Sequence, residues 1–283
     1  MKPDTRTRSA DDATAEDDEL ESWSYRVLSA GGRGMIRGAE FLIRRVIARE
    51  PFPDMATFEW TNSLLDSLPQ IEAEVRSLLE DIDAIPVFQE LSPEQARISV
   101  GAPWRSLVFV FFGRRSRANL QLCPATAAAL SGIPGLTLAM FSVLSPGAEI
   151  AEHRGPFNGV LCYHLPIVVP QDAEACGLEL AGEVRTWRVG DGFVFDDTYR
   201  HRAWNRSSEP RVVLKIDFHR SLPFPLAAMS RVVVWLLGTS PFGRRPMRKV
   251  ADHAAGRVAG ARRSTCTGPL AEPAGPIAPS GTG

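Results

Sequence analysis

The feature that most constrains the fold is a series of short apolar runs between Leu136 and His219, each ended by turn residues. The interruptions are Pro146-Gly147, Gly155-Pro156, Gly182, Gly190 to Gly192 and Ser207-Ser208. Short strands with such regular punctuation are typical of an all-β sandwich or barrel, and roughly eight strands fit this segment. We therefore expect a mainly β chain with flanking helices (α+β) around a double-stranded β-helix, or jelly-roll, core.

Helices are expected on both sides of this core. From Tyr25 to Glu50, and again from Asp54 to about Ile82, apolar residues recur every three or four positions, which is the spacing of one helix face. Residues 104–112 have the aromatic and β-branched content of a buried strand. Residues 123–130 are predicted to form a short helix, and Leu226 to Leu237 a closing helix that is too short to span a membrane.

The length of 283 residues favours one catalytic domain with tails. The predicted parts are an acidic tail at 1–22, a helical region at 23–100, the jelly roll at 101–224, a closing helix at 225–240 and a basic tail at 241–283. The acidic tail contains almost nothing apolar, so burial cannot offset the entropy of ordering it. The basic tail ends in a run of Pro, Gly, Ala and Ser, and both tails are expected to be flexible.

Charge and cysteine content exclude some classes of protein. A net charge of -1 argues against a nucleic-acid binder, which normally carries a basic excess. Four scattered cysteines without a C-x-x-C pair do not suggest a disulfide framework, so a cytoplasmic protein is expected. Arginines on one side of the first predicted helix leave a second reading open, in which this helix contacts an anionic membrane surface peripherally.

Two polar clusters interrupt the apolar runs, and each contains a histidine. His153 precedes Gly155-Pro156, and His201 follows Asp196-Asp197, which we interpret as a turn that positions the histidine. Two neutral imidazoles on facing strands of a small barrel would hold an iron with positions left open for oxygen chemistry. Arg211 follows His201 by ten residues and is a cation able to clamp the carboxylate of an iron-chelating 2-oxo acid. The pattern indicates an iron oxygenase.

Several short motifs surround these residues in a fixed order. They are Ser142-Val-Leu-Ser-Pro-Gly147, His153-Arg-Gly-Pro156, Tyr163-His-Leu165, Glu183-Val-Arg-Thr-Trp187, Phe195-Asp-Asp197, His201-Arg-Ala-Trp-Asn205, Arg211 and Asp217. Together they resemble the aspartyl/asparaginyl β-hydroxylase family of Fe(II)- and 2-oxoglutarate-dependent oxygenases, which implies a cupin-like core. The resemblance covers about a third of the chain. Residues 123–141 are especially similar to the branch that includes bacterial lipid A 2-hydroxylases, which act on acyl chains at a membrane.

The resemblance assigns roles by position. His153 and His201 match the iron-binding histidines. Arg211 matches the arginine that binds the distal carboxylate of 2-oxoglutarate, and Ser142 matches a hydroxyl that assists it. His164 matches a histidine near the iron-chelating end of the cosubstrate. The implied cofactors are Fe(II) and 2-oxoglutarate, with O2 as the second substrate.

Two positions depart from the usual pattern. Gly155 stands where most 2-oxoglutarate oxygenases carry the acid of a facial triad, although animal peptidyl-aspartate hydroxylases also have glycine there. A vacancy that admits chloride keeps halogenation open as a minor alternative. Cys162 stands where the family usually has an arginine that holds a carboxylate of the cosubstrate. Losing that contact costs on the order of 1.5 to 3 kcal/mol, and Arg154, Arg185 and Arg202 are the candidate replacements.

The predicted reaction is hydroxylation of an unactivated carbon, coupled to conversion of 2-oxoglutarate to succinate and CO2. The favoured substrate is the β-carbon of an aspartyl or asparaginyl residue, whether peptidyl, free or carrier-tethered, because Gly155 matches that group. A lipid acyl chain at the membrane surface is the alternative, favoured by the similarity around residues 122–165. A catalytically impaired, cupin-like binding protein is the third reading, suggested by Cys162.

Overall fold

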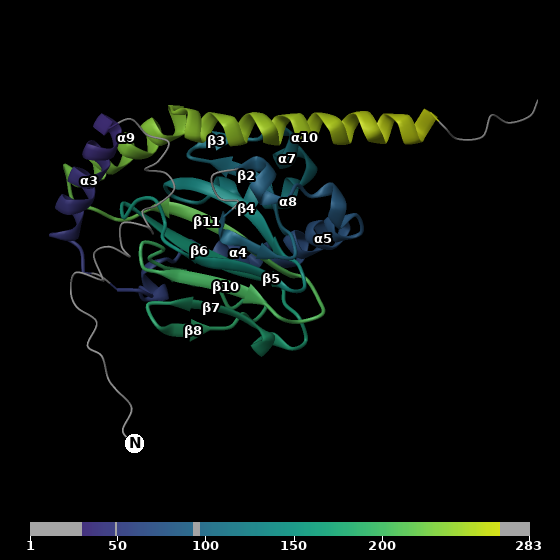
Figure 1. The fold of residues 1–283 in the computed structure, drawn as a ribbon, viewed down its shortest axis with the longest axis horizontal. Coiled ribbons are helices and arrows are strands. Elements are labelled where there is room, and N and C mark those ends of the chain that lie inside the picture. Colours follow the sequence, from purple (N-terminus) through teal and green to yellow (C-terminus); the bar gives the residue numbers. More distant parts are fainter. Residues whose placement is uncertain (1–29, 49, 93–96, 267–283) are drawn as a thin grey trace, which may run out of the picture.

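The computed structural model describes residues 30–48, 50–92 and 97–266, so the predicted acidic tail at 1–22 lies outside the described residues. Two antiparallel sheets lie face to face, with helices around them (Figure 1). In spatial order the first sheet contains β1 (Ser99–Gly101), β5 (Ala148–His153), β10 (His201–Asn205), β7 (Cys176–Leu180) and β8 (Glu183–Arg185). The second contains β3 (Arg114–Arg115), β2 (Trp104–Phe111), β4 (Leu136–Leu144), β11 (Arg211–His219), β6 (Val160–Val168) and β9 (Phe193–Phe195). The predicted mainly β fold with flanking helices is confirmed, and β4 to β11 are the eight strands expected between Leu136 and His219.

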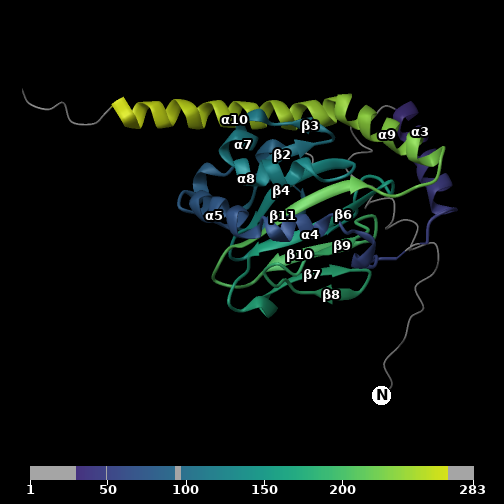
Figure 2. The ribbon, with the colours of Figure 1, turned by 180° about the vertical axis from the view of Figure 1, so that it is seen from behind.

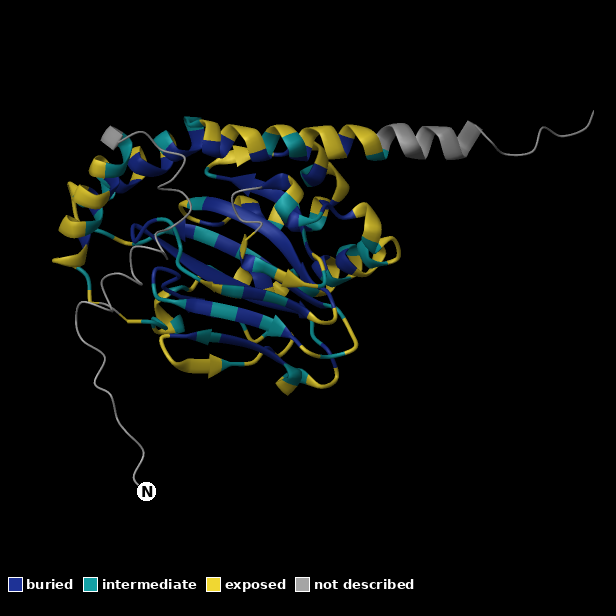
Figure 3. Ribbon diagram, in the orientation of Figure 1, coloured by how far each residue is buried: buried dark blue, intermediate teal, exposed yellow. Residues whose placement is uncertain are grey.

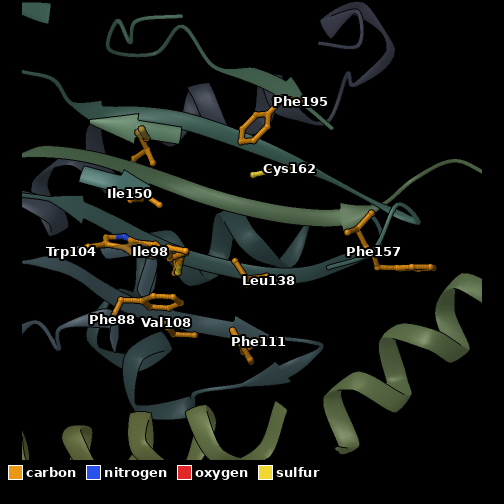
Figure 4. Close-up of a cluster of buried hydrophobic side chains, with 14 of the residues drawn as sticks. Phe88, Ile98, Trp104, Val108, Phe111, Leu138, Ile150, Phe157, Cys162 and Phe195 are labelled. Atoms are coloured by element: carbon orange, nitrogen blue, oxygen red, sulfur yellow. The ribbon is translucent and has the colours of Figure 1, made fainter. Parts of the chain in front are cut away.

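The central strands β2, β4, β6 and β11 of the six-stranded sheet are buried on both faces, which explains why they are almost continuously apolar. Side chains alternate along β11: Val213 belongs to the cluster between the two sheets, whereas Leu214 and Ile216 belong to a second cluster under the helices. Figure 4 shows part of the inner cluster, to which strands of both sheets contribute. Burial colouring marks the central strands β2, β4, β6 and β11 as the interior of the molecule, whereas the edge strands β3 and β8 are largely exposed (Figure 3).

Helices cover the outer face of the larger sheet. They include α4 (Thr61–Asp66), α5 (Leu68–Leu79) and α8 (Pro124–Ser131), with the short helices α6 (Phe88–Leu91) and α7 (Arg117–Leu122) nearby. The prediction of one helix from Asp54 to Ile82 is wrong, because this segment forms a 3₁₀ turn at Met55–Thr57 followed by α4 and α5. Pro69 lies in the first turn of α5. Proline lacks the N–H that a continuous helix needs but is tolerated at a helix start, so a new helix begins there.

Helix α3 (Ala30–Arg44) lies within the first predicted helix and packs beside α9 (Leu226–Thr239). Its buried side chains are Ile36, Ala39 and Ile43, which follow the predicted three- and four-residue steps. Helix α9 occupies the segment expected to form the closing helix.

The prediction of a flexible tail from residue 241 is wrong for its first part. Helix α10 (Pro241–Cys266) runs along one side of the molecule, past α7 and β3 (Figures 1 and 2). Phe242, Val250 and Ala254 are buried and share one helical stripe, which the many intervening arginines obscure in the sequence. Among the described residues no single helix is long and apolar enough to cross a membrane. Helices α9 and α10 reach a sufficient length and apolar content only when taken together, and this pair is bent by 55°.

Candidate active site

His153 and His201 lie side by side on neighbouring strands of the smaller sheet. His153 ends β5, His201 begins β10, and the two residues are direct partners in the antiparallel register. Their ring centroids are 4.1 Å apart. The expectation of facing strands is therefore wrong, because the histidines occupy neighbouring strands of one sheet.

Both imidazoles are held in the form that binds metals. Nδ1 of His153 donates to the carbonyl of Ala151, and Nδ1 of His201 donates to that of Tyr199, each at 2.9 Å. A carbonyl only accepts, so the proton is on Nδ1 and the lone pair of a neutral ring is on Nε2. Burial lowers the pKa of His153 to about 4 and that of His201 below its usual range, so both rings stay neutral at physiological pH. The pair fits a divalent metal that takes nitrogen ligands.

The space beside Gly155 is filled from another element. A Cβ built on Gly155 would lie 2.1 Å from Oδ1 of Asp197, and Gly155 N–H donates to the Asp197 carbonyl at 2.7 Å. An acid at position 155 therefore has no room while Asp197 is in place. Within the described residues, no group of three or more His, Cys, Asp or Glu side chains is arranged to hold a metal, so the protein ligands that the geometry offers are the two histidines.

The neighbouring Asp196 is structural, as the sequence indicated. Its Oδ1 accepts from the N–H and hydroxyl of Thr198 at 3.1 and 2.6 Å, and its Oδ2 accepts from Arg220 at 2.7 Å. These contacts fix the turn before His201. Asp197 differs from this expectation, because its carboxylate lines the same cavity as the histidines and burial raises its pKa to about 7.

Arg211, Ser142 and His164 form a second, deeper group behind the histidines, and they do not line the cavity. The Arg211 guanidinium lies 4.3 Å from the ring centroid of Trp187 and donates to the Ser142 carbonyl at 3.4 Å. The Ser142 hydroxyl accepts from Trp104 Nε1 at 3.0 Å.

Several polar atoms of this deeper group are buried without a hydrogen-bond partner. They are Nε of Arg211, both ring nitrogens of His164 and Nε1 of Trp187. Buried polar atoms are normally paired, and Nε of Arg211, Nε1 of Trp187 and one nitrogen of the neutral His164 ring are donors, so the cluster indicates a ligand rich in oxygen. The residues present thus fit an anion such as a 2-oxo acid.

The cavity in front of the histidines has one polar and one apolar half. The polar half contains His153, Arg154, Gly155, Pro156, Asp197, His201, Lys215 and Asp217; the apolar half contains Phe88, Trp104, Phe111, Phe112, Leu138 and Met140. The imidazole pair therefore lies against an apolar wall that suits a hydrocarbon chain.

Lys215 is a site residue that the sequence prediction missed. Its side chain lines the cavity, is 20% exposed and forms an ion pair with Asp217. A lysine in a strand of valine, leucine and isoleucine was the available signal, since it shares the inward face with Arg211. Among the cations proposed to replace the family arginine, Arg185 pairs with Glu183 and Arg202 pairs with Glu179 at the surface, so neither reaches the cavity.

The chain matches the family model for aspartyl/asparaginyl β-hydroxylase over residues 66–221. It is 38% identical over 191 residues to an ornithine lipid ester-linked acyl 2-hydroxylase of Rhizobium tropici, covering 68% of this chain and 66% of that protein. It is 29% identical over 130 residues to human aspartyl/asparaginyl β-hydroxylase, covering 44% of this chain and 17% of that protein. The chain thus spans just under two thirds of the first relative and about a sixth of the second.

Solved structures that resemble parts of the chain have low similarity. A predicted oxalate decarboxylase from Thermotoga maritima has a TM-score of 0.30 and 13% identity, covering 44% of this chain and 86% of that chain. A cupin domain from Bordetella pertussis has a TM-score of 0.24 and 16% identity, covering 31% and 96%.

Proposed function

The chain belongs to the aspartyl/asparaginyl β-hydroxylase family, and from this we propose that it is an Fe(II)- and 2-oxoglutarate-dependent dioxygenase that hydroxylates a lipid acyl chain. Iron bound between the histidines would supply O2 activation, with one oxygen atom going to the substrate C–H bond and the other to 2-oxoglutarate, which becomes succinate and CO2. The protein's own part is to hold the cosubstrate, orient the carbon and exclude water.

We assign Nε2 of His153 and His201 as the metal ligands. The backbone carbonyls that accept from Nδ1 fix each ring so that Nε2 is the coordinating nitrogen. Arg211 and Ser142 would hold the distal carboxylate of 2-oxoglutarate, and His164 would lie beside its chelating end. The unpaired nitrogen atoms of Arg211 and His164 support this assignment.

The apolar half of the cavity is the main observation in support of an acyl-chain substrate. An acyl chain presents unactivated C–H bonds and no polar groups, and the wall formed by Phe111, Leu138 and Met140 offers it no unsatisfied donors or acceptors. The Rhizobium relative, which is named as an acyl 2-hydroxylase, supports the same substrate class.

We propose further that the protein attaches peripherally to the cytoplasmic side of a membrane through α3 and α9. Apolar side chains on these neighbouring helices are exposed, with Phe41 at 55% and Trp235 at 63% of their surface accessible. Arg44 is the last residue of α3, and Arg45 follows it with its guanidinium 4.5 Å from the ring centroid of Phe41. Apolar and basic side chains together suit the surface of an anionic bilayer.

The attachment can be tested by sedimentation with anionic vesicles. Trp235→Glu and the double variant Arg44→Glu/Arg45→Glu should each reduce the bound fraction. Val184→Glu is the matched control, because Val184 is 54% exposed on β8, at the far end of the molecule from α9 (Figure 1). Equal binding of all variants would contradict the attachment.

Hydroxylation of an aspartyl or asparaginyl residue is the second candidate. Gly155 favours it, because the resemblance places glycine at this position in peptidyl-aspartate hydroxylases. The carboxyl group of Asp197 occupies the space beside Gly155, which disfavours the halogenation alternative because chloride would have to bind in that space.

The deciding experiment incubates the protein with Fe(II), 2-oxoglutarate and labelled O2, together with vesicles of an ornithine lipid or with aspartyl peptides. Transfer of labelled oxygen to an acyl chain, with equal succinate formation, is the expected result. Label in the peptide would favour the second candidate. His201→Ala should lose iron and turnover while keeping its circular dichroism spectrum. If neither substrate is hydroxylated and the protein does not bind 2-oxoglutarate, the remaining hypothesis is a catalytically impaired, cupin-like binding protein.

A further inference from the structure

The strand β6 lacks a cation at the place where the family resemblance expects one. Cys162 points into the cluster between the sheets (Figure 4) and is fully buried. Burial raises the pKa of its thiol well above the usual range, so the side chain is neutral. A neutral thiol cannot form an ion pair with a carboxylate of the cosubstrate.

The neighbouring strand β11 supplies a cation at the same level of the sheet. In the register of these two strands, Asp217 lies opposite Cys162 and Lys215 lies opposite His164. Residues directly opposite in an antiparallel pair have Cβ atoms about 5 Å apart, and diagonal neighbours about 7 to 8 Å. Lys215 is therefore a direct neighbour of His164 and a diagonal neighbour of Cys162, within the reach of its four-carbon side chain.

Lys215 also lies between the two groups of site residues. It lines the cavity that contains His153 and His201, and it shares the inward face of β11 with Arg211. Four residues along a strand separate the Cα atoms of Lys215 and Arg211 by about 13 Å. A span of this length leaves room for a small dicarboxylate between the two side chains.

We propose that the Lys215 ammonium binds the carboxylate at the chelating end of the 2-oxo acid, so that β11 rather than β6 supplies the cation. This assignment rests on the function proposed above. Asp217 orients the ammonium through their ion pair, the Lys215 side chain lines the cavity, and the ammonium has further N–H donors for a second acceptor. With Arg211 on the distal carboxylate, both cations that hold the cosubstrate then come from one strand.

The charge of the cavity supports this arrangement. Lys215 offsets the charge of Asp217, so Arg211 and a divalent metal remain to offset a dianionic cosubstrate. Without Lys215 the largely buried carboxylate of Asp217 would lose its ion-pair partner. The other cation that lines this cavity in the described part of the chain is Arg154, which directly follows His153.

The test measures the dissociation constant of 2-oxoglutarate for anaerobic Fe(II)-loaded protein, by calorimetry and by the visible band of the chelate. Lys215→Met should weaken binding on the order of 10- to 100-fold, the loss expected for one charge-assisted contact. Arg154→Met removes the same charge from the same cavity and should change binding less than about threefold, the equivalent of under 1 kcal/mol.

Two double variants keep the test sound if Lys215→Met leaves Asp217 unpaired and unfolds the protein. Lys215→Met/Asp217→Asn removes both charges and should show the same loss. Lys215→Met/Cys162→Arg returns the cation to β6 and should recover most of the affinity, which a merely structural lysine would not predict.

The outcomes separate the two proposals. If wild-type protein binds 2-oxoglutarate and both Lys215→Met and Lys215→Met/Asp217→Asn bind it equally well, or if Arg154→Met alone weakens binding, Lys215 is not the carboxylate ligand although the oxygenase assignment stands. If wild-type protein retains iron but binds no 2-oxoglutarate at all, both proposals are refuted.

Discussion

Arg211 allows the sharpest quantitative prediction, because the protein buries its charge without a counter-ion. The residue is 1% exposed, and among the described residues its guanidinium contacts the Ser142 carbonyl and the ring of Trp187 but no carboxylate. Burial lowers its pKa to about 10. At about 1.36 kcal/mol for each pKa unit, keeping the buried guanidinium charged costs the ligand-free protein roughly 3 kcal/mol.

Replacing Arg211 by methionine should therefore stabilise the protein when no ligand is bound. Methionine keeps an unbranched apolar chain against Trp187 and removes the charge. Losing the cation–π contact with Trp187 costs about 1 to 2 kcal/mol of stability. Subtracting this cost from the roughly 3 kcal/mol gained by removing the buried charge leaves a net increase of about 1 to 2 kcal/mol in the free energy of unfolding. Wild-type protein should gain about 2.7 kcal/mol at a cosubstrate concentration one hundred times its dissociation constant, whereas the variant should gain nothing. Cosubstrate should thus reverse the order of stability.

Urea unfolding of anaerobic, Fe(II)-loaded protein, with and without 2-oxoglutarate, measures both effects. Arg76→Met on α5 is the matched control, because Arg76 is 67% exposed and pairs with Glu72 at the surface. It should change stability by no more than about 0.5 kcal/mol with or without the cosubstrate. The reasoning is refuted if Arg211→Met is less stable than wild type without ligand, or if 2-oxoglutarate stabilises it as much as it stabilises the wild type.

Three further predictions concern the same cavity. Burial raises the pKa of Asp197 to about 7, so the folded protein binds this proton more tightly than the unfolded chain does. The free energy of unfolding of wild type, relative to that of Asp197→Asn, should therefore fall as the pH rises from about 4 to about 7. Unfolding curves across this range measure the difference, and a difference that does not change with pH contradicts the prediction. Gly155→Asp should destabilise the fold by about 1 to 3 kcal/mol without strengthening iron binding, because a Cβ at this position would lie 2.1 Å from the Asp197 carboxyl group. Tighter iron binding by this single variant would show that the Asp197 side chain moves away and would contradict the prediction. His164→Phe should change the free energy of unfolding of the ligand-free protein by no more than about 1 kcal/mol, because neither ring nitrogen has a hydrogen-bond partner. The same variant should bind 2-oxoglutarate more weakly than wild type. Unchanged affinity measured by calorimetry would show that His164 does not contact the cosubstrate.

The sequence predicted the fold well where local pattern and tertiary environment agree. The strands from β4 to β11 follow the turn residues, because glycine and proline end strands whatever packs against them. Helix α10 was missed because its stability depends on contact with the rest of the molecule. Phe242, Val250 and Ala254 are too few to mark an amphipathic helix by composition, but each is buried against the body of the protein.

The two unusual positions of the site share one physical explanation. By the family resemblance, Gly155 and Cys162 stand where most such oxygenases carry a charged side chain. An ionisable side chain from elsewhere lies beside each: Asp197 next to Gly155, and Lys215 diagonal to Cys162. Position along the chain cannot reveal such neighbours, because they depend on strand register and on a turn between distant segments. Both become visible once β11 is paired with β6 and the Asp197 turn is placed against β5. By sequence position alone the site lacks two charged side chains, whereas in the structure Asp197 and Lys215 both line the same cavity.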